Sequence, residues 1–127
     1  MPEPPLIAIV DDDRSIRAAT QDLFRAAGFR AAAFASAESF LDSPIRAIVA
    51  CLVADMRMPG MSGLELYRQL GAAGQGIPTI LITAYPRELA ESRAREAGIT
   101  CHLIKPFTPD ELLDCVSEAL TKASAER

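Results

Sequence analysis

The stretch "LIAIVDDD", residues 6–13, decides the fold expected for this chain. Five apolar residues without polar alternation are typical of a strand that is covered on both faces. Three carboxylates follow at once, and like charges placed together need a cation or solvent. We therefore expect a buried strand whose carboxyl end carries negative charge, with Asp13 capping the helix that follows.

Apolar runs of this kind recur along the chain and are separated by amphipathic stretches. The runs predict strands over residues 6–10, 29–34, 48–54, 78–83 and 101–105. The amphipathic stretches predict helices over residues 15–27, 37–41, 62 to about 70, 86–97 and 108 to about 123, with capping boxes at Ser62 and Thr108. Strands and helices that alternate in this way predict a parallel sheet with helices on both faces.

Size and charge restrict the class of protein. A chain of 127 residues is long enough for one domain and one core. The net charge of -4 argues against a chain that binds nucleic acid directly, since such binding needs a basic face. No window approaches the roughly 20 apolar residues of a membrane span. We therefore expect a cytoplasmic protein with no membrane contact.

The three cysteines are Cys51, Cys101 and Cys115. Their number is odd, and they form no Cys-x-x-Cys pair. They are interpreted as reduced, mostly buried thiols of a cytosolic protein. Three unpaired cysteines and a single histidine argue against a zinc site.

Polar side chains end four of the predicted strands. Asp11 and Asp12 follow the first strand, Asp55 the third, Thr83 the fourth and Lys105 the fifth. Ligands of such sheets bind beyond the carboxyl ends of the strands, near the switch in strand order. These side chains are therefore expected to converge on one site.

The expected site suits a divalent cation and phosphoryl chemistry. Two carboxylates about 5 Å apart repel by roughly 3 kcal/mol at an effective dielectric constant near 20. Oxygen ligands without thiolate or imidazole favour Mg²⁺. A carboxylate beside that ion can attack phosphorus, and Asp55 is the better candidate because its strand is central. Lys105 and the Thr83 hydroxyl are then available to the phosphoryl oxygens.

Four segments carry a resemblance to a known family. They are "IVDDD" (9–13), "VADMRMPGMSGLEL" (53–66), "PTILITAY" (78–85) and "HLIKPF" (102–107). In this order and spacing, they resemble the receiver domain of two-component response regulators. The implied fold is the CheY-like, flavodoxin-like (βα)5 doubly wound sheet with strand order 2-1-3-4-5. The segment "DMRMPGMSG" most resembles FixJ-type regulators, whose receiver precedes a helix-turn-helix DNA-binding domain.

The resemblance assigns roles around the predicted nucleophile. It implies that Asp55 accepts phosphate from a histidine kinase. It implies that Asp12, Asp55 and the backbone carbonyl of Arg57 bind Mg²⁺ or Mn²⁺, while Asp11 acts through water.

Further roles implied by the resemblance concern the switch. Thr83 is the switch hydroxyl, the small Ala84 leaves room for its movement, and Lys105 clamps the phosphate before a cis Lys105–Pro106 bond. The family usually has Tyr or Phe three residues before the lysine, where this chain has His102. We therefore expect that a movement of Thr83 changes the surface less strongly than in relatives with Tyr or Phe at this position.

The expected function is a phosphorylation-driven switch that catalyses only its own phosphorylation and dephosphorylation, and is otherwise not an enzyme. Residues 1–127 are expected to form one receiver domain, which acts on transcription if a DNA-binding domain follows. Phosphorylation is expected to change the surface formed by residues 86–97 and the last strand and so to promote homodimerisation. One alternative is a stand-alone receiver that serves as an adaptor or phosphate sink. Another is a small aspartyl-phosphate hydrolase like the haloacid dehalogenases, although their nucleophile follows the first strand in a DxD pattern.

Overall fold

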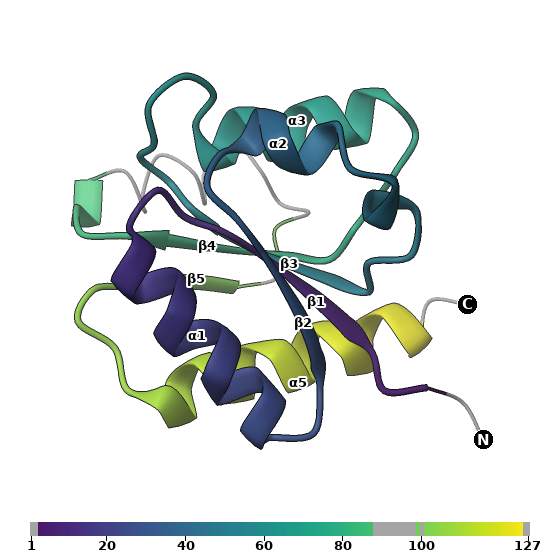
Figure 1. Cartoon of the computed structure of the whole chain (residues 1–127), viewed down its shortest axis with the longest axis vertical. Helices are drawn as coiled ribbons and strands as arrows, with labels where there is room; N and C mark the ends of the chain where they lie inside the picture. The colour runs from purple at the N-terminus through teal and green to yellow at the C-terminus, as the bar shows by residue number, and fades with distance from the viewer. Residues whose placement is uncertain (1–2, 88–98, 100, 126–127) are drawn as a thin grey trace.

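The computed structural model describes residues 3–87, 99 and 101–125, and its centre is a parallel sheet of five strands (Figure 1). The strands are β1 (Leu6–Val10), β2 (Arg30–Phe34), β3 (Cys51–Asp55), β4 (Thr79–Thr83) and β5 (Cys101–Ile104). Their order is β2-β1-β3-β4-β5, and every neighbouring pair is parallel. The predicted flavodoxin-like fold and its strand order are confirmed.

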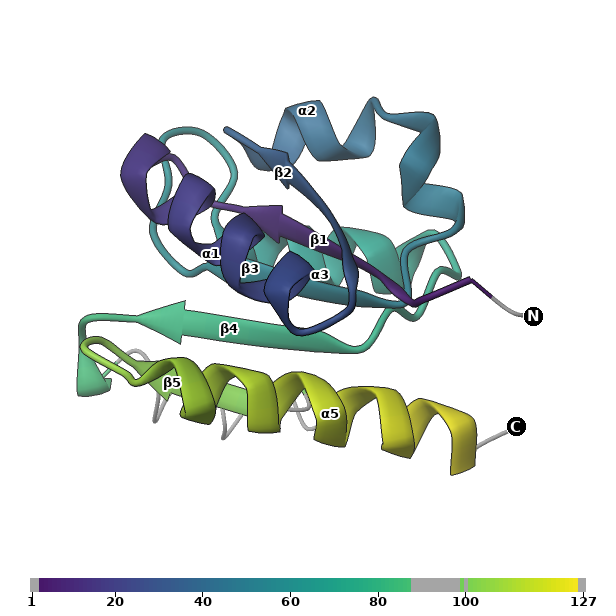
Figure 2. The same ribbon diagram turned by 60° about the horizontal axis from the view of Figure 1, so that its bottom comes forward.

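Helices cover both faces of the sheet. They are α1 (Arg14–Ala26), α2 (Ala37–Leu41), α3 (Gly63–Ala72) and α5 (Pro109–Ala125). α2 and α3 lie on one face, and α1 and α5 lie on the other, as Figures 1 and 2 show. The helix expected over residues 86–97 falls mostly outside the described residues.

Two apolar clusters, one on each face, fix this arrangement. Strand side chains alternate between the faces. Ile7 and Ile9 therefore pack with Phe24 of α1 and with α5, while Ala8 and Val10 pack against α2 and α3. The central strands β1, β3 and β4 are buried along their whole length, which explains their continuous apolar sequence.

Side-chain caps set the helix starts. The Asp13 carboxylate accepts a hydrogen bond from the Ile16 amide at 3.1 Å, so the predicted cap of α1 is confirmed. Ser62 Oγ accepts the Glu65 amide at 3.1 Å. Thr108 and Glu111 each accept from the other's backbone amide, which forms the expected capping box of α5. None of the described helices has the length and apolar character needed to cross a membrane.

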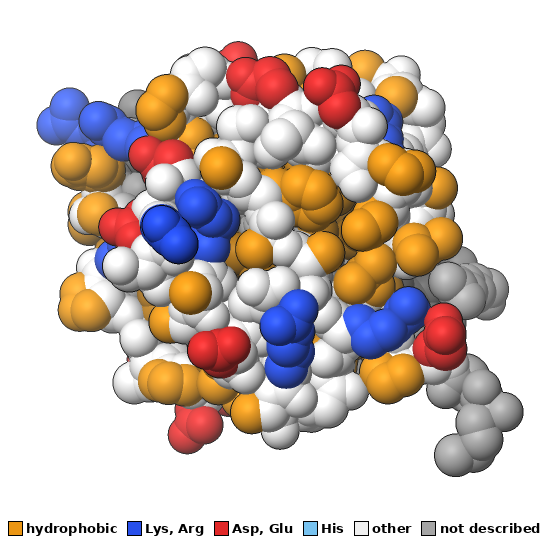
Figure 3. All heavy atoms as spheres, in the orientation of Figure 1, with side chains coloured by type: hydrophobic (Ala, Val, Ile, Leu, Met, Phe, Trp, Pro, Cys, Tyr) orange, Lys and Arg blue, Asp and Glu red, His pale blue; other side chains and the backbone are white. Residues whose placement is uncertain are grey.

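The third strand is shorter at its start than expected. We predicted a strand from residue 48, but Pro44–Ala47 form a 3₁₀ turn capped by Ser43, and β3 begins at Cys51. The side chain of Ile48 is 61% exposed, so the apolar run was wrongly assigned to the strand at this end. Figure 3 shows hydrophobic side chains on the surface in the region where Figure 1 has this turn, while acidic and basic groups are interspersed elsewhere on that face.

The prediction that all three thiols are reduced is wrong for two of them. Cys101 and Cys115 form a disulfide between β5 and α5, with their Cα atoms 6.0 Å apart. Both cysteines belong to the apolar cluster between the sheet and α5. Packing of the helix on the sheet therefore brings them together, although their spacing in the sequence does not indicate a pair. Cys51 is a free, buried thiol, and burial raises its pKa to about 12.

Candidate functional site

Three carboxylates meet where β1 and β3 end. Asp11, Asp12 and Asp55 each offer an oxygen, and these oxygens all lie within 4.8 Å of one another. Asp11 and Asp55 are only 3% and 8% exposed, whereas Asp12 is exposed. The register places Val10 beside Ala54, so the adjacent strands deliver their carboxylates to the same edge. The convergence expected of these three residues is therefore present.

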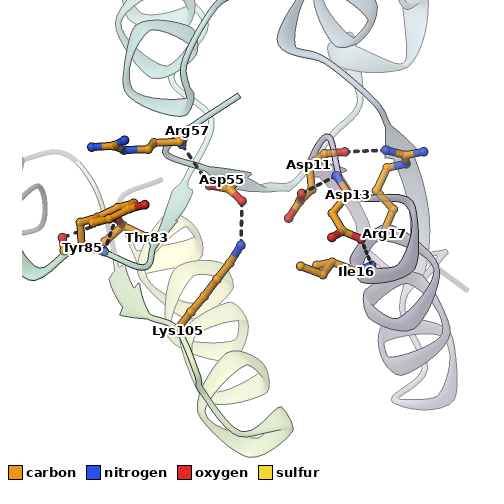
Figure 4. A network of polar contacts seen from close by, with 9 residues as sticks. All are labelled: Asp11, Asp13, Ile16, Arg17, Asp55, Arg57, Thr83, Tyr85 and Lys105. Atoms are coloured by element: carbon orange, nitrogen blue, oxygen red, sulfur yellow. Dashed lines mark hydrogen bonds and ion pairs between the residues drawn. The ribbon is translucent and has the colours of Figure 1, made fainter. Parts of the chain in front are cut away.

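The Asp55 carboxylate has a donor on each oxygen (Figure 4). The Arg57 amide donates to Oδ1 at 3.0 Å, and the Lys105 ammonium donates to Oδ2 at 2.8 Å. Burial lowers the pKa of Lys105, but its hydrogen bond to Asp55 and the charges of the nearby carboxylates raise it by more, so the pKa lies above its ordinary value. Lys105 is therefore a cation that partly offsets the acidic cluster.

Backbone contacts hold Asp55 in place. The Met56 amide donates to the carbonyl of Ile82 in β4 at 2.7 Å. A Cβ atom added to Gly63 would overlap the Asp55 carbonyl oxygen. Only glycine allows α3 to start this close to the end of β3. The capping pattern predicted that a helix starts here, but it did not indicate why residue 63 must be glycine.

Asp11 lies deeper than its neighbour Asp12. Its Oδ1 accepts the Asp13 amide at 2.9 Å, and its carbonyl accepts from the Arg17 guanidinium at 2.8 Å. Burial raises the pKa of Asp11 to about 6; the hydrogen bond from Asp13 opposes this shift, and the Asp55 charge adds to it. Asp11 therefore resists ionisation as long as no cation balances it.

Thr83 ends β4 with a buried side chain, 3% exposed. Its hydroxyl oxygen accepts the Tyr85 amide at 3.0 Å, within the loop that follows the strand (Figure 4). The Lys105 amide donates to the Thr83 carbonyl at 2.8 Å. The hydroxyl is thus held by the next turn, while the backbone of Thr83 is tied to the segment that carries the lysine.

An additional contact joins the loops after β3 and β4. The guanidinium carbon of Arg57 lies 4.0 Å from the ring centroid of Tyr85, and Figure 4 shows the two side chains next to each other, with the guanidinium extending away from the Asp55 carboxylate. Their bulk could be read from the sequence. Their stacking could not, because no local pattern distinguishes a paired arginine from one that extends into solvent.

The remaining predicted positions lie in β5 or next to Thr83 and Lys105 along the chain. Ala84 is exposed, next to Thr83. The Lys105–Pro106 peptide bond is cis, as the resemblance implied. His102 is half-buried in β5 and lies in register with Leu81 of β4, three residues before the lysine.

The donor set fits a hard divalent cation. The clustered ligands are carboxylate oxygens, without thiolate or imidazole among the three, and such ligands suit Mg²⁺. One member is exposed, which leaves a side for water or an incoming anionic group. A buried carboxylate, a cluster of oxygen ligands and an ammonium group thus occupy one place, an arrangement that suits phosphoryl transfer to an aspartate.

Comparison with known proteins agrees with this chemistry. The sequence profile of the response regulator receiver domain matches residues 7–117. The response regulator protein TodT of Pseudomonas putida is 38% identical over 122 residues, which are 96% of this chain and 54% of that protein. The transcriptional regulatory protein FixJ of Azorhizobium caulinodans is 31% identical over 126 residues, which are 99% of this chain and 60% of that protein. The chain thus spans little more than half the length of these relatives.

Solved structures give the same result. The response regulator StyR superposes with a TM-score of 0.88 at 42% identity and covers 98% of this chain and 63% of that one. The structure described as FixJ-N superposes with a TM-score of 0.82 at 32% identity and covers 94% of this chain and 96% of that one. Fold, site chemistry and sequence agree, and the chain belongs to the response regulator receiver domain family.

Proposed function

We propose that this chain is a phosphorylation-driven switch in which Asp55 accepts a phosphoryl group from a histidine kinase. The observation that carries the proposal is the position of the Asp55 carboxylate. It is 2.8 Å from the Lys105 ammonium and belongs to a cluster of three carboxylates whose oxygens lie within 4.8 Å. A buried carboxylate with this surrounding can be both a nucleophile and part of a cation site.

The transfer forms one bond and breaks one. An Asp55 oxygen bonds to phosphorus while the phosphorus–nitrogen bond of the kinase phosphohistidine breaks, and the imidazole keeps the electron pair and takes a proton. Lys105 then faces added negative charge on the phosphoryl oxygens. Its raised pKa keeps it protonated for that task.

The cation site is proposed to take Mg²⁺ or Mn²⁺. Asp12, Asp55 and the Arg57 carbonyl would hold the ion, with Asp11 acting through water. When bound, the ion neutralises phosphoryl charge as the group is transferred. A bound cation would also lower the free-energy cost of ionising the buried Asp11 carboxyl.

The switch is proposed to start at Thr83. Its hydroxyl leaves the Tyr85 amide, to which it is bonded at 3.0 Å, and donates to a phosphoryl oxygen instead. Ala84 is small and offers little resistance to this movement. The loop leads towards residue 86, so the following surface and the face of β5 that bears His102 change with it.

We infer that the output is transcription regulation by a further DNA-binding domain, with residues 1–127 as the receiver. The chain spans little more than half of relatives such as TodT and FixJ, the second of which is a transcriptional regulatory protein. Phosphorylation is proposed to promote homodimerisation, and the protein acts in the cytoplasm beside its kinase. Beyond turning over its own phosphoryl group, it catalyses no reaction.

Acetyl phosphate with Mg²⁺ tests the assignment. Intact-mass and peptide mass spectrometry should show one phosphoryl adduct on wild-type chain, located at Asp55, and no adduct on Asp55→Asn. Asp12→Ala should lose most of the Mg²⁺-dependent rate. Asp22→Asn, which changes an exposed carboxylate of α1, is the matched control and should behave as wild type. A persistent adduct on Asp55→Asn contradicts the proposal.

A further inference from the structure

A covalent bond joins β5 to the helix that packs on it. Cys101 opens β5 and is half-buried, and Cys115 lies in α5 with 6% exposure. Their Cα atoms are 6.0 Å apart, within the usual range for a disulfide. Leu103, two residues further along the strand, packs in the same apolar cluster. Because side chains alternate along a strand, Cys101 faces α5 on the same side as Leu103 and can reach Cys115.

The bond encloses the segment that carries the site lysine. The two cysteines are 14 residues apart, and Lys105 lies between them. Lys105 donates through its side chain to Asp55 and through its amide to the Thr83 carbonyl. A bond that fastens the segment around Lys105 to α5 therefore affects the positions of Asp55 and Thr83, where phosphorylation is proposed to act.

We propose that Cys101 and Cys115 are a reversible redox pair, oxidised by a low-molecular-weight disulfide such as oxidised glutathione, and that the disulfide holds β5 and α5 in the arrangement in which Thr83 is bonded to Tyr85. The regulatory half of this inference rests on the proposed function. In the reducing cytoplasm assigned there, disulfides are usually transient or redox-sensing.

The oxidation proceeds by two exchange steps. The Cys101 thiol is the more exposed of the pair, so it loses its proton and attacks one sulfur of the small disulfide, releasing one small thiolate. Cys115 then loses its proton and attacks the Cys101 sulfur of the mixed disulfide, which releases the second small thiolate. The two thiolates take up the two protons. The cysteine pair has lost two electrons, and the small disulfide has gained them.

The third cysteine is excluded from this chemistry. Cys51 is fully buried in β3, and burial raises the pKa of its thiol to about 12. Its thiolate is too scarce and too inaccessible to react at neutral pH. Cys51→Ala therefore serves as the control that keeps the redox pair and removes the unrelated thiol.

The bond should change the response to a phosphoryl group. If it favours the present arrangement of β5, it must weaken binding of a ligand that favours another arrangement, because coupling between sites is reciprocal. We expect the oxidised chain to bind beryllofluoride, a phosphoryl mimic, several-fold more weakly than the reduced chain. We also expect amide exchange in β5 to slow on oxidation.

The experiment compares wild type, Cys101→Ser, Cys115→Ala and Cys51→Ala in buffers of reduced and oxidised glutathione. Mass spectrometry after thiol alkylation measures the oxidation state of Cys101 and Cys115, and hydrogen exchange measures the protection of the β5 amides. Titration with beryllofluoride and Mg²⁺ reports the response. Wild type and Cys51→Ala should oxidise reversibly, with slower exchange in β5 and weaker beryllofluoride binding, while both variants of the pair should not respond to the buffer.

Failure to form the disulfide in folded wild type, or oxidation that alters neither exchange in β5 nor beryllofluoride binding, overturns the inference. Slower exchange with unchanged binding of the mimic overturns the regulatory half. If the reduced chain itself fails to bind beryllofluoride, the proposed function has failed instead. Oxidation and exchange in β5 then decide the redox inference by themselves.

Discussion

The guanidinium of Arg57 stacks on the ring of Tyr85, with its carbon 4.0 Å from the ring centroid, and this contact joins the loops that follow Asp55 and Thr83. Each residue stands two positions after a site residue. Arg57 also donates its amide to Asp55, and Tyr85 donates its amide to Thr83. The two residues therefore hold both site side chains through their backbone amides, and their stacked side chains belong to the loops next to the carboxylate.

This stacking predicts a long-lived phosphoryl group. Hydrolysis needs a water in line with the Asp55–phosphorus bond, and we expect two large stacked side chains in the neighbouring loops to restrict its approach. Arg57→Ala and Tyr85→Ala should each accelerate decay by roughly tenfold, which corresponds to about 1.4 kcal/mol in the barrier. Decay of chain labelled with acetyl phosphate is the measurement. Arg68→Ala, an exposed arginine of α3, is the control, and unchanged decay in both test variants would refute the crowding argument.

Lys105 is predicted to stabilise the metal-free chain through its ion pair. The side chains of Lys105 and Asp55 are 29% and 10% exposed, so removing the ammonium leaves a poorly solvated carboxylate beside two others. Lys105→Ala should lower the free energy of unfolding by roughly 1–3 kcal/mol, below the range for fully buried pairs because the lysine is partly solvated. Urea unfolding without divalent ions measures the loss.

Two comparisons check the cause of that loss. Saturating Mg²⁺ should stabilise Lys105→Ala more than wild type, because a cation replaces the missing charge. In Asp55→Asn, the same lysine substitution should cost much less. An equal cost in both backgrounds would mean that the lysine acts through packing.

Asp11 gives the metal-free chain an unusual pH dependence. Burial raises its pKa from the ordinary value of 3.8 to about 6 in the folded chain, so between these values the folded state holds more protons than a chain with the ordinary pKa. Its contribution to stability is therefore complete below pH 3.8 and is lost as the pH rises through about 6. At pH 7.5, Asp11→Asn should stabilise the chain by roughly 1–3 kcal/mol, with little gain at pH 4.

Thermal unfolding in chelator across that pH range is the measurement. Asp42→Asn, at the end of α2, is the control for an exposed carboxylate and should show no such gain. With Mg²⁺ present, the advantage of Asp11→Asn should shrink, because the ion balances the wild-type charge. A gain that is independent of pH would argue against ionisation of Asp11 as its cause.

The success and failure of sequence reasoning have physical causes. The sheet was predictable because buried parallel strands need continuous apolar runs, and the convergence of Asp11, Asp12 and Asp55 follows from their places at strand ends. The boundary at Ile48 was missed because an exposed isoleucine looks the same in sequence as a buried one. The Cys101–Cys115 bond depends on how a helix is rotated against a strand, which no local spacing specifies.

The proposed switch is expected to act on the face of β5 that is turned away from α5. In β5, His102 and Ile104 alternate with Cys101 and Leu103, which belong to the core cluster with α5. His102 and Ile104 therefore share the opposite face of the strand. Ile104 is 36% exposed, so part of this apolar edge is open to a partner.

We expect beryllofluoride to promote self-association through this face. Ile104→Ser should weaken association several-fold, on the order of 1 kcal/mol for a partly exposed contact. Ile48→Ser is the matched control, because Ile48 is a more exposed isoleucine, at 61%, that lies before β3. Sedimentation with and without beryllofluoride, under reducing conditions that open the disulfide, provides the comparison.

His102→Tyr tests the coupling itself. Imidazole is smaller and more polar than the aromatic ring that the family usually places here, so it should fill an inward pocket less well and transmit the movement of Thr83 more weakly. The tyrosine variant should therefore associate more tightly than wild type with beryllofluoride, while the two should be alike without it. Equal association of both chains under both conditions would remove this surface from the output, and a receiver that acts alone as an adaptor would then be the better explanation.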